Sequence, residues 1–278
     1  MKLRSLLFVP GDRPDRFAKA AASGADALIL DLEDSVALEK KPEAREAIAA
    51  WLKTGRTLPC FVRVNPLDGG EIEADLRAIL PAPPDGIVLP KAEGAASVRA
   101  LIALAGGSTP PILPIASETA AAVFQLSTYG DVAAHLAGLT WGAEDLPAAI
   151  GATSSRNPDG SYTAPYEMVR ALTLFGAHAA AVPAIETVYP NIADSTGLAA
   201  YVARGRRDGF TGMMAIHPAQ VAAINAGFSP SEAEIAHARA IVEAFAANPG
   251  AGALKLDGKM IDQPHLNQAR KVLTQAES

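Results

Sequence analysis

ALILDLED, at residues 27–34, is an apolar run of strand length that ends in charged residues. The same pattern recurs further along the chain, with a charged or hydrogen-bonding residue at its end, in CFVRVN (60–65), GIVLPKAE (86–93), PILPIASE (111–118) and GLTWGAED (138–145). Strands that are continuously apolar are covered on both faces, as in a parallel sheet with helices packed outside it. The pattern therefore predicts an α/β fold with functional side chains at the strand ends.

Three further apolar segments bring the expected strands to eight: RSLLFV (4–9), AAVPAIE (180–186) and TGMMAI (211–216). Alanine-rich stretches with helical spacing lie between the strands, and several end in glycine, as helices often do. Eight strands alternating with helices predict a (β/α)8 TIM barrel, and 278 residues suit one such domain. A doubly wound open sheet is the alternative, but neither a Gly-x-Gly-x-x-Gly motif after the first strand nor a Walker phosphate loop is present.

We expect the barrel to occupy residues 1–228 and a C-terminal helical extension to occupy 229–278, as an appendage and not an independent domain. Ser229-Pro230-Ser231-Glu232 predicts a capping box with Pro230 at the first helical position of a helix reaching about residue 246. NPGAG (248–252) ends that helix, and a turn at Asp257-Gly258 precedes the last one. Asp262 comes just before this proline-started helix, where its local role is a helix cap.

Composition excludes several classes of protein. A net charge of −6 without a long basic run argues against nucleic acid as a partner. No uninterrupted apolar stretch reaches the roughly 20 residues that span a bilayer, so we expect no membrane partner. The first apolar run is shorter than the roughly 7 to 15 residues of a signal peptide, and the single cysteine cannot form an internal disulfide. These features favour a reducing cytoplasm.

Four carboxylates and one guanidinium follow the expected strands at their carboxyl ends, where barrels build active sites. We expect Asp31, Glu33 and Arg63 to belong to the catalytic set. Glu118 and Asp145 end the adjacent fifth and sixth strands, so their oxygens could share one cation, and oxygen ligands with retained water favour Mg²⁺. For either residue alone, a favourable charge at a helix N-terminus is the simpler alternative.

Arg63 lies in VRVNP, inside an apolar strand, where a guanidinium without a partner is costly. Either Asp31 or Glu33 neutralises it, or it points into the mouth of the barrel, and both can hold together. Its planar fork suits a substrate carboxylate or a developing oxyanion. Lys91, in LPKAE, has a similar placement and is interpreted as a supporting charge.

The basic residues Arg13, Arg16 and Lys19 lie about three positions apart after the first strand. This spacing places them along one face of the helix that follows. They form either a solvated helix face, offset by Asp12 and Asp15, or a phosphate-binding surface.

Taken in order, the motifs closely resemble the citrate lyase beta subunit-like proteins of the malyl-CoA and citramalyl-CoA lyase superfamily. The resemblance covers nearly the whole chain and rests on RSLLFVPGDRPDRFAKAAASGADALILDLEDSV (4–36), VRVNP (62–66), GIVLPKAE, LTWGAEDL (139–146), GFTGMMAIHPAQV (209–221) and GKMIDQPHLNQA (258–269). It implies a lyase that assembles as a homotrimer or hexamer, depends on Mg²⁺, and reversibly cleaves a 3-hydroxyacyl-CoA thioester into an acyl-CoA and a 2-oxo acid.

The resemblance also implies residue roles. Glu118 and Asp145 match the Mg²⁺ ligands and Arg63 the anion-binding arginine. Asp262 matches an acid/base residue on a tail that reaches a neighbouring subunit's site, and the basic segment at 13–19 matches part of the surface that binds the CoA phosphates.

Other activities stay open on the same site. They are a metal-dependent aldolase for free hydroxy-oxo acids, a malyl-CoA thioesterase, and the beta subunit of a multi-subunit citrate lyase that acts on an acyl-carrier thioester. The chain departs from many relatives at Met213, where they have lysine, and at Glu186, where they have aspartate. Because Met213 removes a cation from the expected loop after the seventh strand region, the thioester carrier and its mode of binding are left open.

Overall fold

Eight strands form one parallel sheet in the computed structural model, which describes residues 2–277. Their bounds are β1 Ser5–Pro10, β2 Ala27–Asp31, β3 Cys60–Arg63, β4 Gly86–Leu89, β5 Ile112–Pro114, β6 Leu139–Thr140, β7 Ala184–Glu186 and β8 Gly212–Ala215. The strand order is β5-β4-β3-β2-β1-β8-β7-β6, so the sheet curls with β1 beside β8. The predicted (β/α)8 barrel is confirmed.

The circle closes between β5 and β6 through isolated bridges instead of a continuous ladder. Ile115 pairs with Thr140, and Ile112 pairs with Leu136 just before β6. The Ala116 amide donates to the Thr140 carbonyl at 2.8 Å, and the Ala137 amide donates to the Ile112 carbonyl at 2.7 Å. We call this boundary the β5/β6 seam, because few backbone hydrogen bonds cross it.

Burial on both faces explains the continuously apolar strands. Every residue of β2, β4 and β8 is buried. Alternate side chains point inward, because successive residues of a strand face opposite sides. The interior cluster is made of Leu6, Ala27, Ile29, Phe61, Val88, Leu113, Ile115, Ile185 and Met214.

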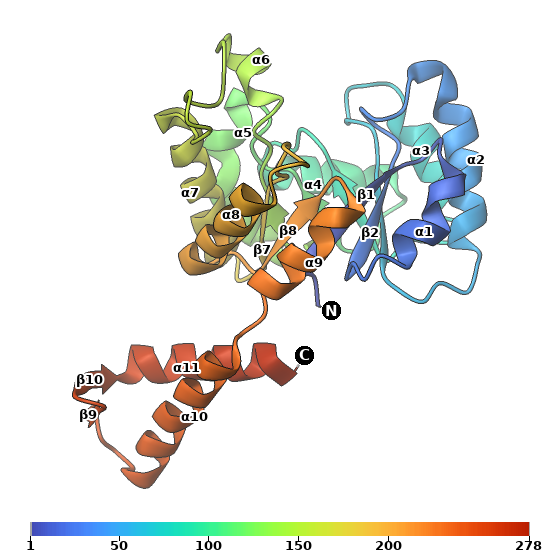
Figure 1. Cartoon of the computed structure of the whole chain (residues 1–278). Coiled ribbons are helices and arrows are strands. Elements are labelled where there is room, and N and C mark those ends of the chain that lie inside the picture. The colour runs from blue at the N-terminus through green and yellow to red at the C-terminus, as the bar shows by residue number, and fades with distance from the viewer. Residues whose placement is uncertain (1, 278) are drawn as a thin grey trace. The chain divides into compact units, whose positions relative to one another are not determined.

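Helices surround the strands of the barrel, as Figure 1 shows. They are α1 Phe17–Ala21, α2 Lys41–Leu52, α3 Ile72–Ile79, α4 Gly94–Leu104, α5 Ala120–Gln125, α6 Leu146–Ile150, α7 Ala164–Ala179, α8 Ser195–Asp208 and α9 Pro218–Gly227. The 3-10 helices η1 Pro14–Arg16, η2 Leu38–Lys40 and η3 Leu126–His135 supplement them. Within residues 2–277, no helix is both long and apolar enough to cross a membrane.

Residues 3–225 and 226–277 form two separate compact units. The second contains α10 Glu232–Ala247, the hairpin strands β9 Ala253–Leu256 and β10 Lys259–Asp262, and α11 Gln263–Glu277. Asp257 and Gly258 both have positive φ, which is the requirement of the tight hairpin turn expected at this dipeptide. This unit has an apolar cluster of its own, formed by Ala238, Ile241, Phe245, Ile261, Leu266 and Ala269.

The expected start of α10 is wrong by two residues. SPSEAE contains two overlapping Ser-x-x-Glu patterns, and the chain uses the second one. The Ser231 hydroxyl accepts from the Glu234 amide, and the Glu234 carboxylate accepts from the Ser231 amide at 2.8 Å. Pro230 therefore lies before the N-cap and not at the first helical position.

Gly86 offers a test of how tightly the barrel interior is filled. A Cβ built on Gly86 would lie 2.1 Å from the ring of the buried Phe61, its partner across β3 and β4. We predict that Gly86→Ala lowers the free energy of unfolding by roughly 1–3 kcal/mol, the usual cost of overpacking a core. Urea denaturation should show a lower midpoint with an unchanged slope.

Gly55→Ala is the matched control, because its added Cβ would meet nothing within 4 Å. Equal midpoints for the two variants would show that the interior accommodates a methyl group beside Phe61.

Candidate active site

Arg63 lies at the carboxyl end of β3, between two carboxylates that follow β2. Its Nε and Nη2 donate to the two oxygens of Asp31, each at 2.6 Å. Its Nη1 lies 2.8 Å from Oε2 of Glu33. The guanidinium also lies over the Phe8 ring, 4.9 Å from the centroid. Both carboxylates expected to neutralise Arg63 thus contact it. Nε has a single N–H group, which Asp31 accepts, but Nη1 and Nη2 each carry a second N–H group for a further acceptor.

Asp31 holds the loop that presents Glu33. Its carboxylate accepts from the amides of Glu33 at 3.0 Å and Ser35 at 3.1 Å. Burial by itself would raise the pKa of Asp31, but the paired guanidinium of Arg63 outweighs it and holds that pKa below the usual value. Asp31 therefore stays ionised and acts on Glu33 through the backbone.

Glu33 differs from Asp31 in the direction of its pKa shift. Burial raises its pKa, against the opposing effects of Arg63 and Lys91. Its Oε1 accepts from Lys91 Nζ at 2.7 Å, whereas Oε2 has no aligned hydrogen-bond donor despite its ion pair with Arg63. A buried carboxylate oxygen without an aligned donor can accept a hydrogen bond from a ligand hydroxyl group, or its proton.

Glu118 follows β5 and is 4 % exposed. Its Oε2 accepts the Lys91 amide at 2.6 Å. The cap of the following helix α5 is Thr119, whose hydroxyl accepts the Ala122 amide, so Glu118 is not engaged as a helix cap. Burial is the main cause that raises the pKa of Glu118 to about 8, and the nearby Asp145 adds to the rise.

Asp145 follows β6 and precedes α6, but its side chain makes no capping hydrogen bond there. One carboxylate oxygen lies 3.3 Å from Lys91 Nζ. Because Lys91 contacts both Glu118 and Asp145, the structure brings these two carboxylates together, as their strand ends predicted. Their oxygens are candidate ligands for a metal ion. Among residues 2–277, no group of three or more His, Cys, Asp or Glu is placed to hold one.

Gly142 makes room for Glu118. A Cβ at Gly142 would lie 2.7 Å from Cγ of Glu118, so the strand that leads to Asp145 approaches Glu118 through a glycine. The sequence showed this glycine inside GLTWGAED, but its neighbour across the seam could not be read from the pattern.

Lys41 holds the loop that carries Glu33, and the sequence patterns did not identify it. Its ammonium is buried and donates to the carbonyls of Leu32 at 2.7 Å and Glu33 at 3.0 Å and to Asn65 at 2.7 Å. These bonds tie the loop after β2 to the end of β3. Lys41 follows Lys40 in the chain, and nothing in the local sequence distinguishes the buried lysine from its exposed neighbour.

Glu186 and Met213, the two departures from related sequences, both lie in the barrel wall. The carboxylate of Glu186 accepts from Trp141, Tyr201 and Arg170, which anchors the segment leading to Asp145. Met213 lies in β8 and is fully buried. Its expected position in a loop is therefore wrong, because β8 extends over this residue, and its side chain faces the opposite side of the sheet from the interior residue Met214.

The basic segment after β1 is exposed, but it is not one continuous helix face. Arg13 precedes the 3-10 turn η1 and pairs with Asp15 at 3.0 Å. Arg16 ends that turn and Lys19 lies on α1, and both are exposed. Pro14 explains the difference, because it begins a tighter turn before the α-helix.

Asp262 ends β10 in the second unit. Its carboxylate contacts His265 Nδ1 at 2.5 Å, and its amide lies 3.3 Å from the same nitrogen. The hydrogen bond from His265 lowers the pKa of Asp262. This contact joins Asp262 to a side chain in the first turn of α11.

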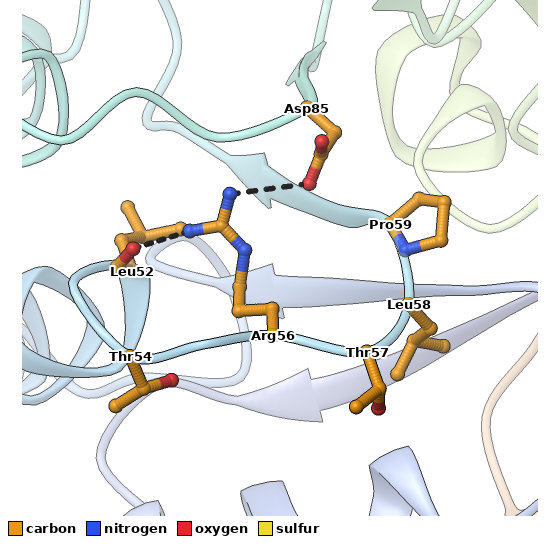
Figure 2. A pocket seen from close by; sticks show the side chains of 7 residues that line it. All are labelled: Leu52, Thr54, Arg56, Thr57, Leu58, Pro59 and Asp85. Carbon is orange, nitrogen blue, oxygen red and sulfur yellow. Dashed lines mark hydrogen bonds and ion pairs between the residues drawn. The ribbon is translucent and has the colours of Figure 1, made fainter.

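A surface pocket of about 310 Å³ lies at the opposite ends of the strands, before β3 and β4. Figure 2 shows Arg56 between the Leu52 carbonyl and the Asp85 carboxylate, which lies 3.3 Å away. Asp85 also accepts the Cys60 amide at 2.9 Å. These groups are mutually paired, and the amino ends of barrel strands serve stability more than catalysis. The candidate active site is therefore the cluster around Lys91.

The raised pKa of Glu118 makes stability depend on pH. The folded-state pKa of about 8 lies above the usual 4.5. Between these values the unfolded state has lost the proton while the folded state keeps it, so stability falls as pH rises. The slope contributed is at most about 1.4 kcal/mol per pH unit. With chelator present, Glu118→Gln should remove this contribution, as urea midpoints from pH 5 to 8 would show.

Glu144→Gln, at an exposed neighbouring position, is the control and should retain the wild-type slope. Parallel curves for wild type and Glu118→Gln would contradict the raised pKa.

Two family descriptions match the chain. HpcH/HpaI aldolase/citrate lyase matches residues 4–218, and the C-C bond lyase of the TIM-barrel fold matches residues 165–278. Among curated relatives, a (3S)-malyl-CoA thioesterase from Cereibacter sphaeroides is 37 % identical, over 99 % of this chain and 95 % of its own length. A citrate lyase subunit beta-like protein from Mycobacterium tuberculosis is also 37 % identical, over 97 % and 94 %.

A solved structure of protein CitE from Mycobacterium tuberculosis, in complex with magnesium, acetoacetate and coenzyme A, superposes with a TM-score of 0.84. It is 35 % identical and the match covers 99 % of this chain and 98 % of that one. The resemblance inferred from the motifs is confirmed: the chain belongs to the HpcH/HpaI aldolase/citrate lyase family.

Proposed function

We propose that this protein is a Mg²⁺-dependent carbon–carbon lyase that cleaves or forms a 3-hydroxyacyl-CoA thioester, with an acyl-CoA and a 2-oxo acid on the other side of the reaction. The observation that carries the proposal is the cluster at the carboxyl ends of the strands. There, Glu118 and Asp145 contact Lys91, and Arg63 lies beside them through Glu33. The family membership supports the reaction class, because its description names aldolases and citrate lyase.

The carboxylates fit Mg²⁺ by their chemistry. Glu118 and Asp145 supply hard oxygen ligands and no nitrogen or sulfur, and two protein ligands leave positions for water and substrate, as Mg²⁺ prefers. Neither side chain caps the helix that follows it, so both are available. Bound there, the ion would supply positive charge to the hydroxyl and carboxylate of the substrate and lower the hydroxyl pKa.

The chain's own groups account for the remaining steps. In the cleavage direction, Oε2 of Glu33 accepts the proton of the substrate hydroxyl, and the hydroxyl carbon becomes the carbonyl of the 2-oxo acid. The electron pair of the broken C–C bond passes to the thioester, which becomes an enolate. The free N–H groups of Arg63 stabilise negative charge during this step. Asp262 then protonates the acyl carbon.

Recognition of the CoA phosphates is assigned to Arg13, Arg16 and Lys19. All three side chains are exposed on the segment that follows β1, so phosphate groups can reach them. Asp15 already pairs with Arg13, which leaves Arg16 and Lys19 as the stronger candidates.

Thioester hydrolysis is the second candidate activity, favoured by the relative named (3S)-malyl-CoA thioesterase. The two activities share the metal and the thioester, but hydrolysis needs a water that attacks the thioester carbonyl. Free CoA as a product distinguishes hydrolysis from cleavage of the C–C bond.

We also propose that residues 229–278 act as an appendage of the barrel, that Asp262 works in a neighbouring subunit's site, and that the protein is a cytoplasmic homotrimer or hexamer. The separation of the second compact unit from the barrel unit, between residues 225 and 226, supports a tail that can reach another copy. In the proposed oligomer of closed symmetry, every tail has a neighbouring copy in the same assembly.

The function is tested by assaying pairs of acyl-CoA and 2-oxo acid for condensation with Mg²⁺. We expect at least one pair to give a 3-hydroxyacyl-CoA, and chelator to abolish the reaction.

Arg63→Lys keeps the charge but loses the planar fork, so turnover should fall by roughly one to three orders of magnitude, or about 1.4 to 4 kcal/mol of transition-state stabilisation.

Arg77→Lys, at an exposed arginine on α3, is the control and should turn over like wild type. Equal processing of free acids and their thioesters would favour the aldolase alternative. Release of free CoA without C–C cleavage would instead favour the thioesterase.

The role of Asp262 is tested by complementation. We predict that Arg63→Ala and Asp262→Asn are each nearly inactive, and that their co-expression restores a measurable fraction of activity. In mixed oligomers, some sites then combine an intact Arg63 with an intact Asp262 from another copy. If mass spectrometry verifies mixed assembly and activity stays at the level of the single variants, Asp262 does not act in a neighbouring site.

A further inference from the structure

Lys91 has an unusual backbone conformation for a lysine. It follows β4 after Pro90 and has φ of 50°, in the left-handed region that residues with a Cβ seldom adopt. A strained conformation of this kind persists only where surrounding contacts hold it, and such positions are common at functional sites. The contacts of Lys91 therefore show which interactions the left-handed conformation allows.

The positive φ lets one residue serve two neighbours. The Lys91 amide donates to Oε2 of Glu118 at 2.6 Å. The side chain leaves the same Cα toward Glu33 and Asp145, with Nζ at 2.7 Å and 3.3 Å from their oxygens. Because φ sets the direction of the side chain relative to the amide, a residue that resists positive φ cannot keep both arrangements.

The ionised groups around Lys91 carry an excess of negative charge. When all four carboxylates are ionised, as oxygen ligands of a bound cation are, Asp31, Glu33, Glu118 and Asp145 outnumber the cations of Arg63 and Lys91 by two. This is the charge that one divalent cation neutralises. The ammonium contact to Asp145 is longer than its contact to Glu33, so Asp145 is the partner held more loosely.

We propose that Lys91 is a positioning residue that sets the metal affinity of the site through two separate groups. Its amide fixes the Glu118 carboxylate, and its ammonium holds Asp145 in the absence of metal and gives Asp145 up when the cation binds. The inference rests on the proposed Mg²⁺ site. It adds that the protein carries an internal cation that competes with the metal for one of the two ligands.

Competition between the Lys91 ammonium and the metal predicts the direction in which Mg²⁺ affinity changes in each variant. Removal of the ammonium leaves the site with more negative charge and frees Asp145, so Mg²⁺ should bind more tightly. Disturbance of the amide moves a carboxylate oxygen of Glu118, so Mg²⁺ should bind more weakly. A purely structural lysine would give neither a gain on charge removal nor a dependence on the φ preference of its replacement.

Isothermal titration of Mg²⁺ into the metal-stripped protein separates the two groups. Lys91→Met, Lys91→Gly and Lys91→Val all lack the ammonium. Glycine adopts positive φ freely, methionine has an unbranched Cβ as lysine does, and the β-branched valine resists positive φ more strongly than either. We expect Kd for Mg²⁺ to fall about tenfold in the Met and Gly variants, a free-energy change of about 1.4 kcal/mol. The Val variant should bind at least tenfold more weakly than the Met variant.

Lys53→Met is the charge-matched control, because Lys53 is exposed just after α2, and its Kd should equal that of wild type. Circular dichroism checks that each variant is folded. If the Val variant does not fold, the Met and Gly arms still decide the role of the ammonium, and Lys91→Asn, which tolerates left-handed φ, should match Gly.

The possible outcomes are distinct. Met and Gly variants that bind Mg²⁺ with wild-type or weaker affinity would overturn the competition by the ammonium. A folded Val variant that binds as tightly as Met would overturn the role of the amide. Wild-type protein that binds no Mg²⁺ would overturn the metal site of the proposed function and this inference with it, whereas normal wild-type binding with unaffected variants would overturn this inference alone.

Discussion

The two-point contact between Arg63 and Asp31 is the interaction on which the rest of the candidate site depends. Both groups are largely withdrawn from solvent, with the carboxylate 1 % and the guanidinium 13 % exposed. Loss of one partner of a buried pair leaves an uncompensated charge and typically costs about 3–5 kcal/mol. The pair also fixes the loop after β2, because the oxygens of Asp31 accept the amides of Glu33 and Ser35. Glu33 reaches Lys91 only from this loop.

Strand ends were predictable from the sequence because a single physical rule governs them. A strand covered on both faces must be apolar along its length, so the first charged residue after it marks the rim. Asp31, Arg63, Glu118 and Asp145 were found in this way, and the structure brings them into one connected cluster. The count of eight such strands also gave the barrel.

Other parts could not be read from the sequence, because they depend on contacts between distant segments. Lys91 was recognised as a charge, but its left-handed backbone and its three carboxylate neighbours come from β2, β5 and β6 folding around it. Lys41 looks like its exposed neighbour in the chain. Where two local patterns overlap, as in SPSEAE, the sequence does not say which one the helix uses.

The β5/β6 seam lies between the two candidate metal ligands. Glu118 follows β5 and Asp145 follows β6, so the two carboxylates stand on opposite sides of the boundary that isolated bridges join in place of a continuous ladder. A cation held by both would link the β5 and β6 sides of the barrel across this seam. The amides of Ala116 and Ala137, which donate across that boundary, would then exchange their hydrogens for deuterium more slowly when the cation is bound. Hydrogen exchange at these two amides would therefore report metal binding without any substrate.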